Sequence, residues 1–328
     1  FFFQFTLSAF WLVAFTSATH DIAADGYYMH ALDDHEQSLY VGIRSTFYRI
    51  ATVAGQGLLV ILAGFLEEKS GNIPMAWMVT FGCLSVIFLL AALNHQYILP
   101  RPASDHAAVE VKASTVAKEF LETFKTFFTK RNAVVAILFM LLYRLPEAQL
   151  VKLITPFMLD PIDKGGLGLT TGEVGFVYGT VGIIGLTIGG ILGGMAAAHG
   201  GLKRWLWPMV CAITLPDLVY VYLSYVQPSS MFVINACVFV EQFGYGFGFT
   251  AYMLYLIYFS EGAHKTAHYA ICTGFMALGM MLPGMAAGWL QETIGYRHFF
   301  VWTILCCLVT FIITAFLKID PQFGKKNS

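Results

Sequence analysis

Charged side chains are scarce in this sequence: Asp, Glu, Lys and Arg make up 12% of the residues, whereas hydrophobic types make up 57%. A soluble domain carries roughly a quarter charged residues. A chain this apolar cannot cover itself with polar surface, so part of its solvent must be lipid. The formal net charge of -1 offers no basic face for the phosphates of a nucleic acid. The composition therefore excludes a soluble globular domain and a nucleic-acid-binding protein.

Motifs for metal, redox and nucleotide chemistry are also lacking. The six cysteines fall in apolar runs without C-x-x-C spacing, so we expect packing residues rather than ligands. The glycine-rich stretch 172–194 is not followed by the Lys-Ser/Thr of a phosphate-binding loop. Glycines four apart favour close helix packing instead. We therefore expect a protein without metal or cofactor, and not an enzyme.

Long apolar runs dominate the chain. A membrane-spanning helix needs about 20 mostly apolar residues. Nine stretches qualify: residues 1–30, 42–66, 75–95, 132–159, 172–198, 205–226, 230–259, 267–291 and 298–317. The chain opens inside the first stretch without the basic region of a signal peptide. We expect three further spans before it, which gives an all-α polytopic protein of twelve helices in the two six-helix halves of a major-facilitator fold.

Lysine and arginine are distributed unevenly between the two ends of these spans. Thirteen lie on the side of the polar stretch 96–131: Arg44, Arg101, Lys112, Lys118, Lys125, Lys130, Arg131, Lys203, Arg204, Lys265, Lys318, Lys325 and Lys326. Three lie on the other side: Lys69, Lys164 and Arg297. Because cytoplasmic loops carry the excess of positive charge, we expect a multi-pass protein of the bacterial inner membrane with a cytoplasmic C-terminus.

The polar stretch divides the chain into three parts. Residues 1–95 hold three spans of an N-terminal bundle, residues 96–131 form a central cytoplasmic loop, and residues 132–328 form a six-helix bundle with a short tail. Within the loop, apolar residues from Val116 to Phe128 recur at helical spacing among lysines. This pattern predicts an amphipathic helix along the inner leaflet. A solvated linker is the alternative.

Two carboxylates stand on the first span. Asp21 and Asp25 are four residues apart in H-D-I-A-A-D, which places both on one helix face. Carboxylates this close raise each other's affinity for protons, so we expect the pair to couple proton movement to transport. The alternative is that both lie in headgroup water near Asp33. Arg49, on the second span, is a candidate ion-pair or gating partner for them.

The fourth span carries charges beside a proline. Arg144 and Glu147 are three residues apart, and Lys152 lies two turns beyond Arg144 on a similar face. Pro146 removes a backbone hydrogen bond and predicts a kink. Charges beside a helix break at membrane depth indicate a substrate site in transporters. We expect Arg144 to bind a substrate carboxylate and Glu147 to line the same site; an internal salt bridge is the alternative.

Acidic residues recur in the sixth and seventh spans. A charge at mid-depth costs about 2.5–3.5 kcal/mol, so each needs a partner or a wet cavity. Glu241 and Gln242 precede closely spaced glycines that let a ligand or helix approach, and we place both in the substrate site. Asp217 follows Pro216 and, like Lys152, is a candidate for an ion pair or a gate.

The segment S-A-T-H-D-I-A-A-D-G-Y-Y, residues 17–28, resembles the signature of the AmpG muropeptide permeases, a branch of the major facilitators. The likeness continues in order at residues 48–49, 130–148, 172–175, 238–248 and 283–289. It implies proton-driven import of GlcNAc-anhydroMurNAc peptides, a step of peptidoglycan recycling. It also implies proton coupling at Asp21 and Asp25, and functional roles for Arg144, Glu147 and Glu241. His20, Ala23-Ala24 and Pro146 depart from the family pattern.

We therefore expect a monomeric permease that contacts the lipid bilayer and a small-molecule substrate. A major facilitator for another substrate, such as a sugar or an acetyl-CoA-like anion, is one alternative. An integral-membrane transferase is another, but it would gather its catalytic groups at one interface. Here the polar residues lie within several different spans.

Overall fold

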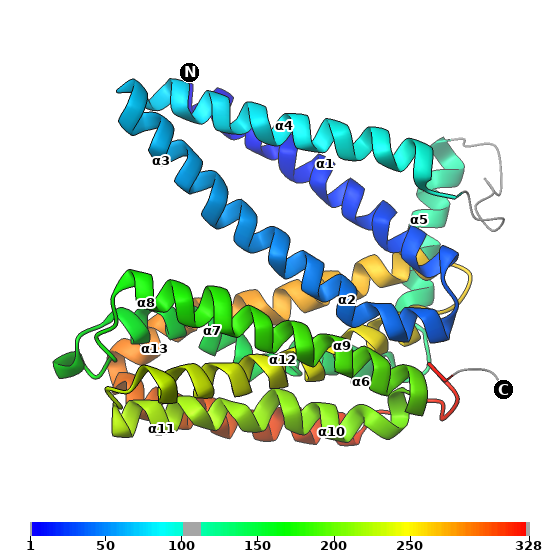
Figure 1. Ribbon diagram of the computed structural model, residues 1–328. Coiled ribbons are helices and arrows are strands. Elements are labelled where there is room, and N and C mark those ends of the chain that lie inside the picture. Colours follow the sequence, from blue (N-terminus) through cyan, green and yellow to red (C-terminus); the bar gives the residue numbers. More distant parts are fainter. Residues whose placement is uncertain (1, 101–112, 326–328) are drawn as a thin grey trace. The chain divides into compact units, whose positions relative to one another are not determined.

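Helices make up all the regular structure in this computed structural model, which describes residues 2–100 and 113–325 (Figure 1). The predicted all-α class is confirmed. Contacts divide the chain into two compact units, residues 1–43 with 108–328, and residues 44–107. The predicted three-part organisation remains a prediction. Arg101, Lys112 and Lys326, which entered the comparison of the two ends, lie outside the described residues.

The unit of residues 44–107 contains a helical hairpin. The end of α2 (Asp34–Val53) continues through the π-turn η1 (Ala54–Leu58) into α3 (Leu59–Ser70), and α4 (Ile73–Ile98) returns. Gly71 ends α3 at φ 64°, a left-handed conformation that glycine adopts without steric cost. Asn72 then caps α4, because its side chain accepts a hydrogen bond from the Met75 amide at 3.1 Å.

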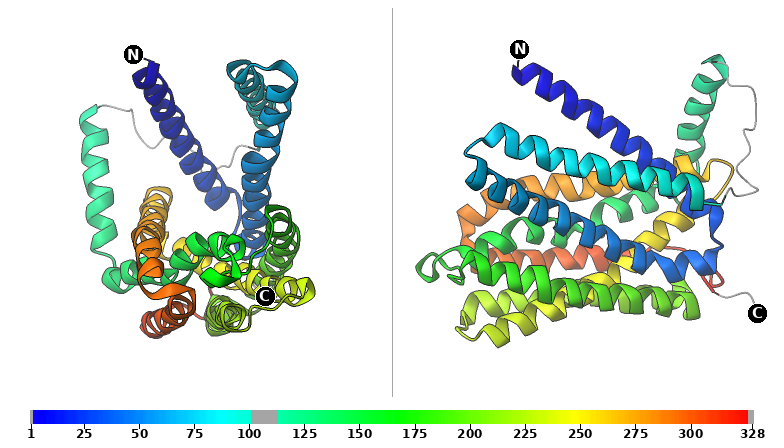
Figure 2. Two further views of the ribbon diagram at one scale, coloured as in Figure 1. Left: turned by 90° about the vertical axis from the view of Figure 1, so that its left-hand side faces the viewer. Right: turned by 45° about the horizontal axis from the view of Figure 1, so that its top comes forward.

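The other unit contains α1 (Phe2–Ala31), the start of α2, the loop helix α5 (Ala113–Phe128) and a C-terminal bundle. The helices of the bundle are α6 (Ala133–Leu142), α7 (Leu145–Leu159), η2 (Ile162–Lys164), α8 (Thr171–Phe176), η3 (Val177–Gly182), α9 (Ile183–Gly200), α10 (Leu202–Thr214), η4 (Leu215–Asp217), α11 (Leu218–Val226), α12 (Met231–Ser260) and α13 (Lys265–Ala315). They run side by side in both views of Figure 2.

The connections of the bundle alternate between two ends. At one end, Tyr296 donates a hydrogen bond to Asp160 at 2.7 Å and Gln227 donates one to the Gly166 carbonyl at 2.8 Å. At the other end, the Leu202 amide bonds the Phe323 carbonyl and Lys130 bonds the Phe259 carbonyl. Lys164 and Arg297 belong to connections of the first end, and the basic residues at 130, 203, 265 and 318 belong to the second. The charge asymmetry of the sequence thus coincides with two physical ends.

Six of the described helical stretches are long and apolar enough to cross a membrane: Ile73–Ile98, Ala133–Leu159, Thr171–Gly200, Leu202–Val226, Met231–Ser260 and Lys265–Ala315. The last is 51 residues long and contains Gly295 at φ 74°, ψ 163°, where two helices meet. Residues 2–30 of the first predicted range and all of the range 42–66 are also helical. Nine spans out of twelve remain a prediction.

Helix α9 packs closely on α12 through glycines. A Cβ atom at Gly189 would overlap the carbonyl oxygen of Phe243, and one at Gly246 would overlap that of Leu186. Only residues without a side chain permit two backbones to approach this closely. The predicted role of the glycine-rich span in helix packing is confirmed.

The hairpin formed by α1 and the start of α2 contacts the bundle at one end. Residues 3–24 of α1 are largely exposed, whereas Asp25, Gly26 and Met29 are buried. A Cβ atom at Gly42 would overlap the Gly190 carbonyl oxygen of α9. The hairpin is therefore attached to the bundle by direct backbone contact.

Helix α5 confirms the helix predicted in the central loop. Phe127 is fully buried against Phe259 and His268, and the hydroxyl of Thr126 lies 3.1 Å from His268 Nε2. Phe120, on another face, is exposed. One face of α5 thus packs on the bundle, and its position along the inner leaflet remains a prediction.

Candidate functional site

The fourth predicted span is broken where its charges lie. Helix α6 ends at Leu142 and α7 begins at Leu145, with Pro146 in its first turn. Since proline has no N–H, the carbonyl of Leu142 loses its partner in the helix. The hydroxyl of Thr310 on α13 reaches this carbonyl at 3.4 Å and that of Tyr143 at 3.1 Å. The kink predicted from Pro146 is present, and a neighbouring helix supplies the missing hydrogen bond.

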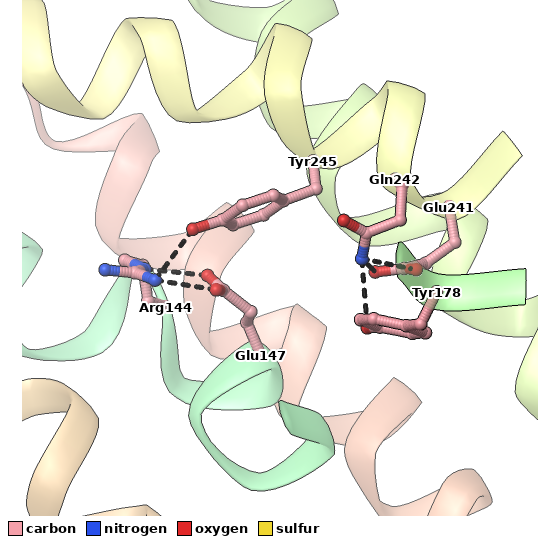
Figure 3. Close-up of polar contacts among 6 residues, drawn as sticks. All are labelled: Arg144, Glu147, Tyr178, Glu241, Gln242 and Tyr245. Atoms are coloured by element: carbon pink, nitrogen blue, oxygen red, sulfur yellow. Dashed lines mark hydrogen bonds and ion pairs between the residues drawn. The ribbon is translucent and has the colours of Figure 1, made fainter. Parts of the chain in front are cut away.

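Arg144 and Glu147 form an ion pair at this break (Figure 3). Arg144 Nε donates to Glu147 Oε2 at 2.7 Å, and Nη2 donates to Oε1 at 2.6 Å. Both residues are buried, with exposed fractions of 9% and 8%. A two-pronged pair fixes both groups and neutralises their charges in surroundings of low dielectric.

Two aromatic residues of α12 also contact the guanidinium of Arg144. Arg144 Nη2 also donates to the Tyr245 hydroxyl at 3.0 Å (Figure 3). The guanidinium carbon lies 4.8 Å from the centre of the Phe249 ring, a distance typical of a cation–π contact. The Tyr143 and Tyr252 rings stack beside the break with centroids 5.1 Å apart. These contacts tie the broken span to α12.

A second polar group lies on α12 one turn before Tyr245. Gln242 Nε2 donates to the Glu241 carboxylate at 2.9 Å and to the Tyr178 hydroxyl at 3.0 Å (Figure 3). The Tyr220 hydroxyl donates to Glu241 Oε2 at 2.9 Å. Tyr178 comes from the π-turn η3, a type of irregularity often found at functional sites.

We call the six residues of Figure 3 the polar cluster: Arg144, Glu147, Tyr178, Glu241, Gln242 and Tyr245. The structure thus brings the four predicted substrate residues into one region, and adds two tyrosines that sequence reasoning missed. Tyr245 lies four residues after Glu241, so helical spacing alone could have indicated it. Tyr178 carried no such signal, because its partners come from another helix.

The remaining predicted residues lie outside this cluster. Asp217 is buried in η4, at the break between α10 and α11, and its Oδ2 lies 4.0 Å from the sulfur of Cys307. Lys152 is exposed and forms no ion pair with the described residues. Asp25 is buried and Asp21 exposed on α1. The side chain of Arg49 lies outside the described residues, so its predicted pairing remains a prediction.

Comparison with known proteins identifies the family. Residues 1–267 match the Major Facilitator Superfamily. The chain belongs to this superfamily. Its major-facilitator membership makes it a multi-pass membrane transporter for a small molecule, and not an enzyme.

Two bacterial relatives match nearly the whole chain. The chain is 27% identical to "Putative transporter AmpG 4" of Rickettsia conorii over 313 residues, which are 94% of this chain and 71% of that protein. It is 25% identical to "Anhydromuropeptide permease" of Escherichia coli over 316 residues, 96% of this chain and 60% of that protein. The predicted resemblance to AmpG permeases is confirmed as a distant homology. The chain spans about three fifths of the Escherichia coli permease.

Proposed function

We propose that the protein is a proton-coupled transporter that imports muropeptides, GlcNAc-anhydroMurNAc peptides, across the bacterial inner membrane by alternating access. The homology to a permease with the printed name "Anhydromuropeptide permease" supports this substrate class. The observation that carries the proposal is the polar cluster, because buried charges at broken helices are a typical feature of transporter substrate sites. Ionisable residues within membrane spans are costly, and those that are retained typically mark a substrate or ion pathway.

In the proposed cycle, Asp21 or Asp25 takes a proton while the site faces the periplasm. Substrate binds between the residue 1–95 bundle and the residue 132–328 bundle, and contacts Arg144, Glu147, Glu241 and Gln242. A rocking movement then exposes the site to the cytoplasm and releases both substrate and proton. Arg49, Lys152 and Asp217 are proposed to act in ion pairs or gates during this movement.

The test is uptake of a radiolabelled anhydromuropeptide in cells that carry the full-length protein. Asp21→Asn and Asp25→Asn keep the size of each side chain and remove its negative charge. Each should reduce uptake about 100-fold or more while leaving the protein in the membrane, since a positioned proton-transfer group typically contributes about 10²–10⁴-fold. Undiminished, proton-dependent uptake in both variants would remove the aspartates from the mechanism.

Competition with unlabelled ligands tests the substrate class separately. Excess anhydromuropeptide should abolish uptake of the label, whereas glucose and acetyl-CoA should not. Competition by glucose or acetyl-CoA as strong as that by the unlabelled anhydromuropeptide would contradict the proposed substrate.

A further inference from the structure

The hydrogen bonds of Arg144 leave one of its nitrogens open. An arginine side chain donates through Nε, Nη1 and Nη2, and each Nη carries two N–H groups. Glu147 takes Nε and one N–H of Nη2, and Tyr245 takes the other. Nη1 donates to none of the described residues. In Figure 3 it points away from both partners. The Arg144 side chain as a whole is nine-tenths buried.

The charge of Arg144 is already compensated. Its partner is a carboxylate held by two short contacts, so the pair has no net charge. A substrate carboxylate would have to approach Nη1 beside the negative Glu147, or displace it. Displacement would leave a buried carboxylate without its cation, which is strongly unfavourable. An uncharged oxygen can accept a hydrogen bond from Nη1 without repulsion from Glu147 and without displacing it.

Gln242 offers the complementary open position. Its amide nitrogen is fixed by bonds to Glu241, because a carboxylate can only accept. The amide oxygen therefore faces the other way, as Figure 3 shows, and accepts no bond from the described residues. Gln242 has an exposed fraction of 7%. The cluster thus presents an open donor on Arg144, whose charge Glu147 compensates, and an open acceptor on Gln242.

We propose that Nη1 of Arg144 receives an uncharged oxygen of the substrate, an amide carbonyl or a hydroxyl, and that the Arg144–Glu147 pair excludes a carboxylate from this position. This inference rests on the proposed function and replaces the expected contact between Arg144 and a substrate carboxylate. Glu147 then determines specificity, because it compensates the charge of the guanidinium and so favours an uncharged oxygen over an anion at Nη1.

The experiment measures the affinity of two probes for the purified full-length protein and for its variants. The two probes are GlcNAc-anhydroMurNAc with its lactyl group as the free acid and the same disaccharide as the lactyl amide. The double variant Arg144→Gln/Glu147→Gln removes the guanidinium without leaving an unpaired charge. It should weaken both probes by the same factor, about tenfold, because the lost contact is to an uncharged oxygen in both.

A second variant separates this role from a merely structural one. Glu147→Gln leaves Arg144 with a full positive charge, so the acid should gain about tenfold in affinity relative to the amide. Structural damage would not produce a gain for one probe. Lys203→Gln, which removes a positive charge from an exposed residue at one end of the bundle, is the control and should leave the ratio unchanged.

Each other outcome has a definite meaning. Selective weakening of the acid by the double variant would show that Arg144 binds a carboxylate and would overturn the inference alone. Unchanged binding of both probes by the double variant would also overturn it. If the unmodified protein binds neither probe, the proposed muropeptide substrate fails, and this inference fails with it.

Discussion

The polar cluster and the aspartate pair of α1 place charge within predicted spans in different ways. In the cluster the backbone is broken, the charges lie on an interrupted helix, and side chains from α12 and η3 complete their hydrogen bonds. Helix α1 is unbroken over 30 residues, and its two aspartates differ in burial. The hydrogen bonds of the cluster therefore come from contacts between helices. The placement of both aspartates on one face of α1 follows from their spacing within one helix.

This difference separates two functional demands. A site that holds an uncharged group needs fixed donors and acceptors, and the ion pair fixes them at the break. A site that accepts and releases a proton must be able to change its charge. The contact of the α1–α2 hairpin with the bundle includes glycines at close approach, Gly42 against Gly190 and Gly194 against Leu39.

The largest effect should come from breaking the ion pair on one side. Arg144→Ala leaves Glu147 buried without its cation, which should destabilise the protein by about 3–5 kcal/mol. Asp21→Ala, on an exposed position of α1, should change stability by about 0.5 kcal/mol or less. Thermal unfolding in detergent measures both. If Arg144→Ala unfolds at the same temperature as the unmodified protein, the pair does not stabilise the broken span.

The next effect concerns closure of the hairpin on the bundle. Gly42→Val would place a branched side chain against the Gly190 carbonyl, so the two backbones could not reach their present separation. We expect uptake of labelled anhydromuropeptide to fall about tenfold, because a displacement of about 1 Å is enough for such a loss. Gly64→Val is the matched control, since no atom lies within 4 Å of its Cβ position. Equal uptake by the two variants would mean that this contact is not part of the transport cycle.

Local features of the cluster could be predicted from the sequence, and tertiary ones could not. The break at Pro146 and the proximity of Arg144 and Glu147 follow from spacing within one helix. The hydroxyl of Thr310 was not predicted, because it reaches the break from α13, more than 160 residues away along the chain. Spacing also placed Asp21 and Asp25 on one face, yet it could not show that only Asp25 is covered, since burial depends on what packs there.

The smallest effect concerns the loop between α12 and α13, close to the start of α2. Burial, and then the negative charge of Asp34, raise the pKa of the Glu261 carboxyl above its ordinary value, against the opposing charges of Lys265 and Lys130. The folded protein therefore binds this proton more tightly than the unfolded chain does. Its contribution to stability is present at low pH and is lost as the pH rises through the raised pKa.

Glu261→Gln should accordingly make the fall in melting temperature shallower as the pH rises from the ordinary pKa of a glutamate through the raised pKa. Because Glu261 is exposed and solvent screens its charge, we expect a shallower slope rather than a large shift. Glu119→Gln, at an exposed position of α5, provides the reference slope for removing one carboxylate. If the Glu261→Gln slope equals that of the unmodified protein, then the hairpin exerts no electrostatic effect on this loop, and the difference between the two regions is one of packing alone.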